Sequence, residues 1–312
     1  MGDRAPLTVR FGAVFPVHDV GRDRFAVRDF AAGVEALGFD HLVVYDHVVG
    51  AERSGRVPPF TGPYDHRDEF HEPLVLLGHL AAVTERIELV TGVVVAPQRQ
   101  TALLAKQAAE VQILSGGRLR LGLGTGWNRV EYEALGADFA RRGEVLDEQV
   151  GVLRRLWTED LVTVDAPHHR IDRAGLAPLP STMVPVWFGG YGEAALRRSS
   201  ALGDGHVFGH LRPSILDSAQ RLRAGCGRGF GLEAISDVLV DEDRWAADLS
   251  AWSGVGGTHL TARTLRTAGV GDTGIRTVDE HLAALGRWLG VVRDVDRDVD
   301  RDVDRDVRSR HP

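Results

Sequence analysis

The chain has 312 residues, 43% of them hydrophobic, which is enough to bury the core of one large domain or of two small ones. Its formal charge of −7, with 37 basic and 44 acidic residues spread along the chain, leaves no basic stripe for nucleic acid. The single cysteine excludes an intramolecular disulfide, and the sequence contains neither an apolar signal core nor a run long enough to cross a bilayer. We therefore expect a soluble cytoplasmic protein without nucleic-acid or membrane partners.

Apolar strand patterns alternate along the chain with helical patterns. The strands are predicted at Val9–Phe15, His41–Asp46, Ile87–Val95, Arg118–Leu123, Val184–Phe188, Gly205–Phe208, Ala234–Val240 and Thr258–Thr264. The helices are predicted at Phe25–Leu37, Pro73–Thr84, Ala102–Leu114, Gly143–Leu156, Glu193–Ala201, Ser214–Ala224, Glu242–Ala251 and Val278–Leu289. Eight strands with right-handed helical connections predict an α/β fold, a (β/α)8 TIM barrel, whose chemistry lies at the carboxyl ends of the strands.

Two long connections interrupt this alternation. The segment Val49–His71, a long loop after strand 2, is rich in Pro, Gly and charge and is long enough to be a substrate lid over the barrel mouth. The segment Leu161–Pro185 is an insertion between strands 4 and 5. It contains the alternating pattern LVTVDAPHHRID, which is compatible with a hairpin, but neither its length nor its polarity indicates which face it covers.

The C-terminus has a different composition. From Arg293 the unit Arg-Asp-Val-Asp repeats three times, and a fourth copy begins before the chain ends in RSRHP. Asp is a poor helix former, and one Val in four residues buries little apolar surface. We therefore divide the chain into a barrel domain at residues 1–292 and a disordered repeat tail at residues 293–312.

Asp46 and His47 follow the second predicted strand. A carboxylate beside an imidazole can hold a polar ring by hydrogen bonds and move one proton near neutral pH. If the pair stood alone, the better interpretation would be that Asp46 caps the next turn and that His47 is only a histidine at the barrel rim. The glycine-containing ends of the neighbouring strands favour the functional one.

Three predicted strands end in glycine-containing turns. Strand 3 ends in TGVVV and strand 4 in GLGTGWN, which departs from the dinucleotide fingerprint GxGxxG. After strand 5, Gly189, Gly190 and Gly192 precede a predicted helix, so free backbone amides and the positive helix end would face an anion. A tight turn would need one glycine rather than three. These turns suit a flat aromatic ring with a phosphorylated side chain.

Four segments carry a family resemblance: ALGFDHLVVYDHV, the stretch from TGVVVAPQRQ to GWNRVEYEALG, the helix RRGEVLDEQVGVLRRLW and the turn FGGYGEAALRRSSALGDG. Together they resemble the luciferase-like monooxygenase superfamily, and particularly its branch of oxidoreductases that depend on the deazaflavin coenzyme F420. The resemblance covers the chain up to the repeat tail. It implies a (β/α)8 barrel with an insertion, and a homodimer.

The resemblance also implies roles for individual residues. His47 resembles the catalytic proton donor or acceptor, and Asp46 the residue that hydrogen-bonds the deazaflavin ring. Thr91, Gly92 and Val93 match the place of a non-prolyl cis peptide against the ring. Further cofactor contacts are expected at the ring edge and at the phosphate, from Thr125, Gly126, Gly189, Gly190 and Tyr191. Trp127 stands where the sugar-phosphate dehydrogenases of the branch have a carboxylate, so glucose 6-phosphate is not the expected substrate.

These roles predict hydride transfer between F420 and a small organic substrate, with His47 moving the accompanying proton. Trp127 and Tyr64, with the lid residues Phe60 and Phe70, would form an apolar wall around the substrate. The same lid aromatics could equally anchor the loop to the barrel. Arg99 and Lys106 are in reach of an acidic cofactor tail, but charged residues on a barrel helix are more often solvated surface.

Other functions remain open at this stage. A monooxygenase that uses flavin mononucleotide (FMN) on the same barrel would carry similar turns, because flavin and deazaflavin are nearly isosteric. A non-catalytic paralogue that only binds F420 or flavin is another possibility. We expect no metal site, because the histidines form no assembled ligand set, and no acyl-transfer chemistry, because the chain has no GxSxG motif.

Overall fold

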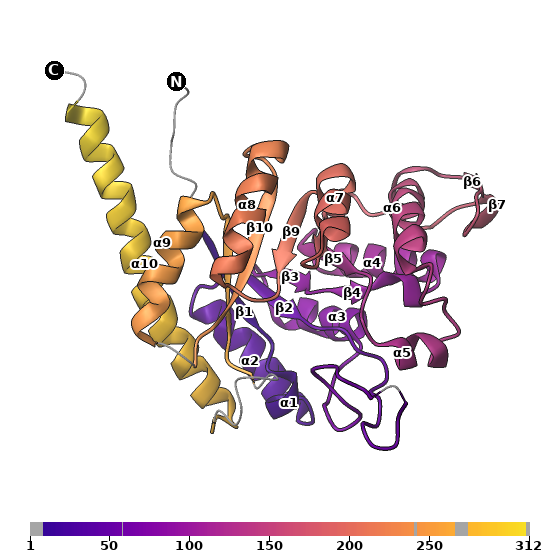
Figure 1. Ribbon diagram of the computed structural model, residues 1–312, viewed down its shortest axis with the longest axis horizontal. Helices are drawn as coiled ribbons and strands as arrows, with labels where there is room; N and C mark the ends of the chain where they lie inside the picture. The colour runs from indigo at the N-terminus through magenta and orange to yellow at the C-terminus, as the bar shows by residue number, and fades with distance from the viewer. Residues whose placement is uncertain (1–8, 58, 240–241, 266–273, 310–312) are drawn as a thin grey trace.

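The computed structural model describes residues 9–57, 59–239, 242–265 and 274–309. Within this part of the chain, eight parallel strand positions close into a barrel surrounded by helices, as predicted (Figure 1). In chain order the strands are β1 (Arg10–Val14), β2 (His41–Val44), β3 (Glu88–Thr91), β5 (Leu119–Gly124), β8 (Val186–Gly189), β9 (Gly205–Phe208), β10 (Gly231–Asp237) and β11 (His259–Arg263). The pairings of β1 with β11 and of β3 with β5 close the ring.

The third barrel strand is interrupted. The sequence predicts one strand over Ile87–Val95, whereas the structure has β3 and a short continuation, β4 (Val94–Val95), which pairs with the end of β5. Between them the Gly92–Val93 peptide bond is cis. A cis non-prolyl bond lies where the resemblance places it.

Side-chain alternation along the strands separates the barrel interior from the helix-packed exterior. In β2 and the residue after it, Val43 and Tyr45 join an interior cluster, while Leu42 and Val44 belong to the main core beneath the helices. Further down the barrel, Arg120 binds Glu233 at 2.5 Å and its guanidinium lies 4.1 Å from the Trp187 ring. These side chains occupy the lower interior, and the cavity described below lies toward the carboxyl ends of the strands.

Helices flank the sheet at each connection. They are α1 (Val17–Val20), α2 (Arg24–Ala36), α3 (Pro73–Val83), α4 (Thr101–Leu114), α5 (Arg129–Ala134), α6 (Arg142–Thr158), α7 (Glu193–Leu202), α8 (Pro213–Cys226), α9 (Trp245–Gly254) and α10 (Val278–Ser309), with 3-10 turns at Ala96–Gln98 and Glu242–Arg244. In α2, Asp23 caps the first turn, and Val27, Phe30, Ala31 and Val34 face the core at helical spacing. The short helix α5 is not predicted by the sequence pattern.

The insertion between strands 4 and 5 contains the hairpin expected from its alternation, with β6 (Val162–Asp165) antiparallel to β7 (Arg170–Ala174). His169, the last residue before β7, contacts Thr101 of α4 and Glu148 of α6, both at 2.6 Å. The hairpin therefore lies against the outer helices at one side of the molecule (Figure 1). The long loop after β2 lies at the end of the barrel that also holds α5.

The repeat segment differs from the expectation of a disordered tail. Helix α10 continues through it to Ser309 and forms the long yellow helix at one side of Figure 1. Val292 is fully buried and Val295 packs against the core, while Asp294 and Arg297 pair one turn apart at 3.5 Å. A helix nucleated on the barrel extends at lower cost than an isolated one, which explains the difference.

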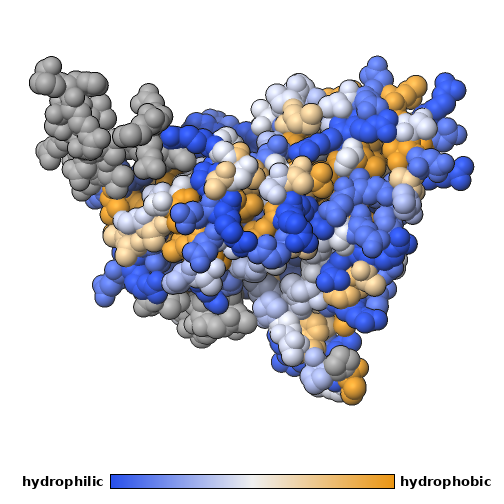
Figure 2. All heavy atoms as spheres, turned by 45° about the horizontal axis from the view of Figure 1, so that its top comes forward, coloured by the Kyte–Doolittle hydropathy of each residue, from blue (hydrophilic) through white to orange (hydrophobic). Residues whose placement is uncertain are grey.

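On the face shown in Figure 2, apolar and hydrophilic side chains are interspersed. None of the helices in the described ranges is long and apolar enough to span a membrane.

Candidate active site

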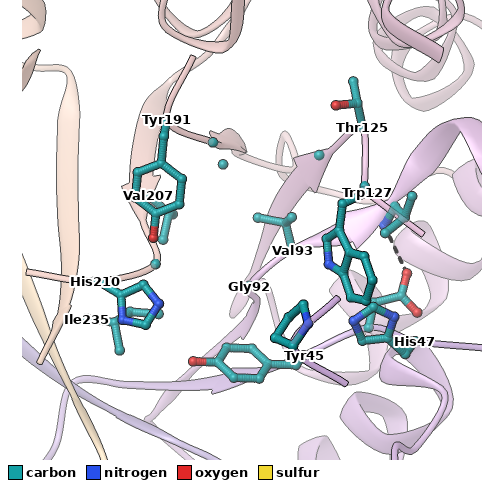
Figure 3. A pocket seen from close by; sticks show the side chains of 18 of the residues that line it. Tyr45, His47, Gly92, Val93, Thr125, Trp127, Tyr191, Val207, His210 and Ile235 are labelled. Carbon is teal, nitrogen blue, oxygen red and sulfur yellow. Dashed lines mark hydrogen bonds between the residues drawn. The ribbon is translucent and has the colours of Figure 1, made fainter. Parts of the chain in front are cut away.

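A cavity of about 500 Å3 opens at the carboxyl ends of the barrel strands. Its lining includes nearly every residue that the sequence analysis selected, namely Asp46, His47, Tyr64, Gly92, Val93, Thr125, Gly126, Trp127, Gly189, Gly190 and Tyr191. Phe60 and Phe70 of the expected substrate wall are not part of this lining. Thr91 is also absent from it, because it is fully buried and its hydroxyl bonds the backbone of Gly122. Figure 3 shows His47 and Trp127 on one side of the cavity, Tyr191 and His210 on the other, and Val93 between them. The roles proposed for these residues remain predictions.

Val93 projects into the space between strands β5 and β8, and glycines make room for it. A Cβ atom on Gly124 would lie 2.6 Å from a Val93 methyl, and one on Gly189 would lie 2.8 Å from the other methyl. Any side chain at these two positions would collide with Val93. The glycines of GLGTG and FGG therefore permit the bulge at Gly92–Val93.

Asp46 is buried and both of its carboxylate oxygens have protein partners. One oxygen accepts a hydrogen bond from Val95 N–H at 2.9 Å, and the other lies 2.7 Å from an Arg99 Nη2. Arg99 also binds Glu72, the cap of α3, at 2.6 Å. Burial raises the pKa of the Asp46 carboxyl, and Arg99 opposes that rise. Arg99 is thus a half-buried residue held by two carboxylates rather than solvated surface, and Asp46 fixes the start of the long loop against the strand after the bulge.

His47 is held by Glu131, a residue that the sequence analysis did not select. Its Nδ1 lies 3.3 Å from Glu131 Oε2, and Glu131 Oε1 accepts hydrogen bonds from Val48 N–H and Val49 N–H at 2.5 and 3.2 Å. Burial acts to raise the pKa of Glu131, but its hydrogen bonds outweigh that effect and the pKa lies below its usual value. An ionised carboxylate only accepts, so Nδ1 carries a proton and Nε2 is left for the cavity.

Aromatic side chains from the lid and from the turn after β5 surround His47. The ring centroids of Tyr64, Phe70 and Trp127 lie 5.4, 4.7 and 5.4 Å from the imidazole. Phe60 contacts Trp127 at 5.6 Å, so the lid and the turn form one apolar wall. These aromatics therefore anchor the loop to the barrel beside His47, whereas the substrate contacts expected for Trp127 and Tyr64 stay a prediction.

The turn after β8 leads into α7 without a side-chain cap. Gly192 is the N-cap residue, so the first N–H groups of the helix have no side-chain acceptor. Gly190 has φ +144°, a conformation that favours glycine, and its carbonyl lies 2.9 Å from Nε2 of the buried His206. Burial lowers the pKa of His206 to about 4, so its imidazole is neutral at pH 7. His206 thereby fixes the peptide at the point where an anion would approach the helix.

The far wall of the cavity holds a second group of residues that the sequence analysis did not select, comprising Tyr45, His210, Asp237 and Arg263. Arg263 binds Asp237 at 2.6 Å, the Tyr45 hydroxyl at 3.2 Å and His210 Nδ1 at 2.9 Å. All but Asp237 line the cavity directly. Among the described residues there is no cluster of three or more His, Cys, Asp or Glu side chains that could hold a metal ion.

Comparison with known proteins decides the family. Residues 12–233 match the model of the family described as luciferase-like monooxygenase. The chain belongs to the luciferase-like monooxygenase family. This confirms the family expected from the sequence motifs, and the match ends before the repeat segment.

Relatives of this luciferase-like protein include an uncharacterized protein of Mycobacterium tuberculosis, 34% identical over 207 residues that cover 64% of this chain and 71% of the relative. An F420-dependent glucose-6-phosphate dehydrogenase of Nakamurella multipartita is 29% identical over 205 residues, or 65% of this chain and 56% of that enzyme. Among solved structures, an F420-dependent secondary alcohol dehydrogenase in complex with an F420-acetone adduct superposes with a TM-score of 0.70 at 16% identity. That superposition covers 91% of this chain and 99% of the other, and it supports the barrel fold.

Proposed function

We propose that this luciferase-like protein is an F420-dependent oxidoreductase that transfers a hydride between the deazaflavin ring and a small organic substrate. The observation that carries the proposal is that His47 and the uncapped glycine turn before α7 line the same cavity. Relatives named as F420-dependent enzymes support the choice of cofactor.

The residues of the cavity fit such a cofactor. About 500 Å3 lies within the range of roughly 300–1,000 Å3 typical of small-molecule sites. The bulge at Val93 offers a surface for a flat ring, and Gly189, Gly190 and Tyr191 would hold the phosphate at the N-terminus of α7. Side chains at Gly189 or Gly190 would collide with Val93 or Ala195. When bound, F420 supplies a ring carbon that gives or accepts a hydride.

The protein side chains would orient the substrate and handle its proton. Glu131 fixes Nδ1 of His47, so Nε2 can donate a proton to the substrate or accept one from it. Trp127, Tyr64 and Phe70 surround the imidazole and exclude water from that exchange.

The substrate side of the cavity is apolar. Trp127 packs against the lid so closely that a Cβ atom on Gly62 would overlap its ring. An indole neither accepts a proton nor pairs with a charged sugar phosphate. We therefore infer a small, largely apolar substrate and not glucose 6-phosphate.

Turnover tests this function directly. The purified protein would be assayed with F420 and with FMN against a panel of small alcohols, carbonyl compounds and activated alkenes. We expect loss or gain of deazaflavin absorbance with at least one substrate, and His47→Ala should slow this by roughly 10²- to 10⁴-fold while keeping F420 affinity. Oxygen-dependent turnover with FMN alone would support the monooxygenase alternative, and F420 binding without any turnover would support a non-catalytic protein.

We also propose that the protein is a homodimer. The helices α3 and α4, which pack side by side, expose the apolar residues Val75, Leu103 and Leu114. Burying such residues against a second copy would remove apolar surface from water. The mass in solution, measured by light scattering, should be about twice that of one chain, and Leu103→Glu should lower it to that of one chain.

A further inference from the structure

We propose that the cavity wall across from His47 binds an acceptor oxygen of a ligand through two donors, the Tyr45 hydroxyl and the His210 Nε2–H, which Arg263 orients. This inference deepens the proposed function. It rests on that function only for the identity of the ligand that carries the oxygen. Figure 3 shows His210 across the cavity from His47, with the Tyr45 hydroxyl pointing from below toward His210.

Arg263 lies at the centre of this wall with all of its N–H groups engaged. Its side chain is only 4% exposed. Nε and Nη2 bind Asp237 at 2.6 and 2.5 Å, and Nη2 also contacts His210 Nδ1 at 2.9 Å. Nη1 donates to the Tyr45 hydroxyl at 3.2 Å and to the Gly209 carbonyl at 3.3 Å. Arg263 therefore has no free donor for a ligand and acts as a positioning residue.

The direction of these hydrogen bonds determines what Tyr45 and His210 present to the cavity. A guanidinium only donates, so the Tyr45 oxygen and His210 Nδ1 both accept. The Tyr45 hydroxyl must then donate its own hydrogen elsewhere, and a neutral His210 carries its proton on Nε2. The alternative contact of Nδ1, to Asp237 Oδ2, is longer at 3.4 Å. In the described part of the chain no hydrogen bond uses the remaining proton of either group.

Strand alternation explains why these groups meet. Val43, Tyr45 and Ile235 belong to the cluster inside the barrel, and Asp237 follows Ile235 by two residues, so its side chain is on the same face of β10. Arg263 ends β11, next to Asp237 at the end of β10 in the sheet. His210 lies just after β9, which pairs with β10 on the other side.

The charges of this wall define the chemistry of the ligand. Burial raises the pKa of the Tyr45 phenol, so it remains a donor at neutral pH. Burial also opposes the ionisation of Asp237, but its contact with His210 and its ion pair with Arg263 hold the pKa of the carboxyl below the usual value, so the charges of Asp237 and Arg263 balance. Two donors beside a balanced pair of charges suit a carbonyl or enolate oxygen better than a phosphate. Such an oxygen occurs on the dione edge of a deazaflavin and on a ketone or alcohol substrate.

Nitrogen NMR of the protein labelled with 15N-histidine tests the donor wall without depending on turnover. We expect His210 to be the Nε2–H tautomer in the free protein. The protein would then be titrated with F420 alone, with cyclohexanone alone and with both. A shift of His210 Nε2 on adding F420 alone identifies the cofactor as the source of the oxygen, and a shift that requires cyclohexanone identifies the substrate. An Nδ1–H tautomer, or no shift in any titration, would overturn the proposal.

Variants separate this proposal from the proposed function. Tyr45→Phe keeps the packed ring and should weaken binding of the oxygen-bearing ligand about 5- to 10-fold, as loss of one hydrogen bond predicts. Arg263→Gln should move His210 toward the Nδ1–H tautomer, which a purely structural role would not do. Tyr64→Phe removes a hydroxyl from the lid side and should leave the His210 tautomer unchanged. If F420 does not bind but cyclohexanone still shifts Nε2, the cofactor assignment fails and the donor wall stands.

Discussion

His47 Nδ1 and Glu131 Oε2 lie 3.3 Å apart, although 84 residues separate them in the chain. The same carboxylate binds two backbone N–H groups of the lid at its start, so one buried side chain fixes both the imidazole and the loop that covers it. The positions of the His47 imidazole and of the start of this loop thus depend on one residue in α5.

Glu131→Gln should lower kcat about tenfold or more with little change in F420 affinity. Gln keeps an oxygen for Val48 N–H but loses the charge, and hydrogen bonds to charged groups are the stronger ones. Glu133→Gln, in the same helix, serves as the control because Glu133 is exposed and pairs only with Arg129 in the described structure. Steady-state kinetics of both variants and of the original protein test this. If Glu131→Gln has the same kcat as the Glu133→Gln control, Glu131 does not position the imidazole of His47.

Arg99→Met should destabilise the protein by about 3 kcal/mol, because it leaves the buried Asp46 carboxylate without its cation. Adding Asp46→Asn to this variant should restore part of the loss. Lys106→Met is the matched control, since the pair of Lys106 with Glu110 is exposed and worth about 1 kcal/mol or less. Urea unfolding gives the free energy of unfolding of the two single variants and of the double variant. An equally small loss for Arg99→Met and Lys106→Met would contradict a structural role for Arg99.

Gly192→Asp should weaken F420 binding about tenfold and leave the fold intact. A Cβ at this position meets no atom within 4 Å, and Asp is a good N-cap, but its charge would repel a phosphate at the start of α7. Gly192→Ser caps the helix without adding charge and should bind nearly as well as the original protein. The difference should shrink at high salt. Equal affinities of the Asp and Ser variants would place the phosphate elsewhere.

His206 should make the protein less stable in mild acid. Its pKa of about 4 lies below the ordinary value of 6.5, so the unfolded chain binds more protons between these two pH values. The contribution of His206 to the free energy of unfolding is fully present above about pH 6.5. It decreases by about 3 kcal/mol as the pH drops to 4. His206→Gln, which can still donate to the Gly190 carbonyl, should lose most of this slope. Unfolding free energies at several pH values would show whether the slopes differ.

Much of the site could be predicted because buried parallel strands appear in the sequence as apolar runs. The residues that follow these runs are expected at the mouth of the barrel. This rule located Asp46, His47 and the glycine turns. The sequence also contained an unused signal, because Asp237 and Arg263 are charged residues near the ends of the strands predicted at Ala234–Val240 and Thr258–Thr264. Charged side chains at the end of a barrel strand belong to the mouth.

The remaining features depend on contacts that no local pattern records. Glu131 and Arg99 meet their partners across 84 and 53 residues, and both look like surface residues in sequence. The end of α10 was missed for a related reason. Propensity counted residue by residue predicts disorder for an Asp-rich repeat, whereas a helix anchored at Val292 needs no new nucleus to continue.

Binding titrations of the purified protein with F420 and with FMN, followed by fluorescence, test the central claim most directly. The account predicts that F420 binds substantially tighter than FMN and that Gly192→Asp weakens the binding of F420. Binding of FMN in preference to F420, or an F420 affinity that Gly192→Asp leaves unchanged, would contradict it.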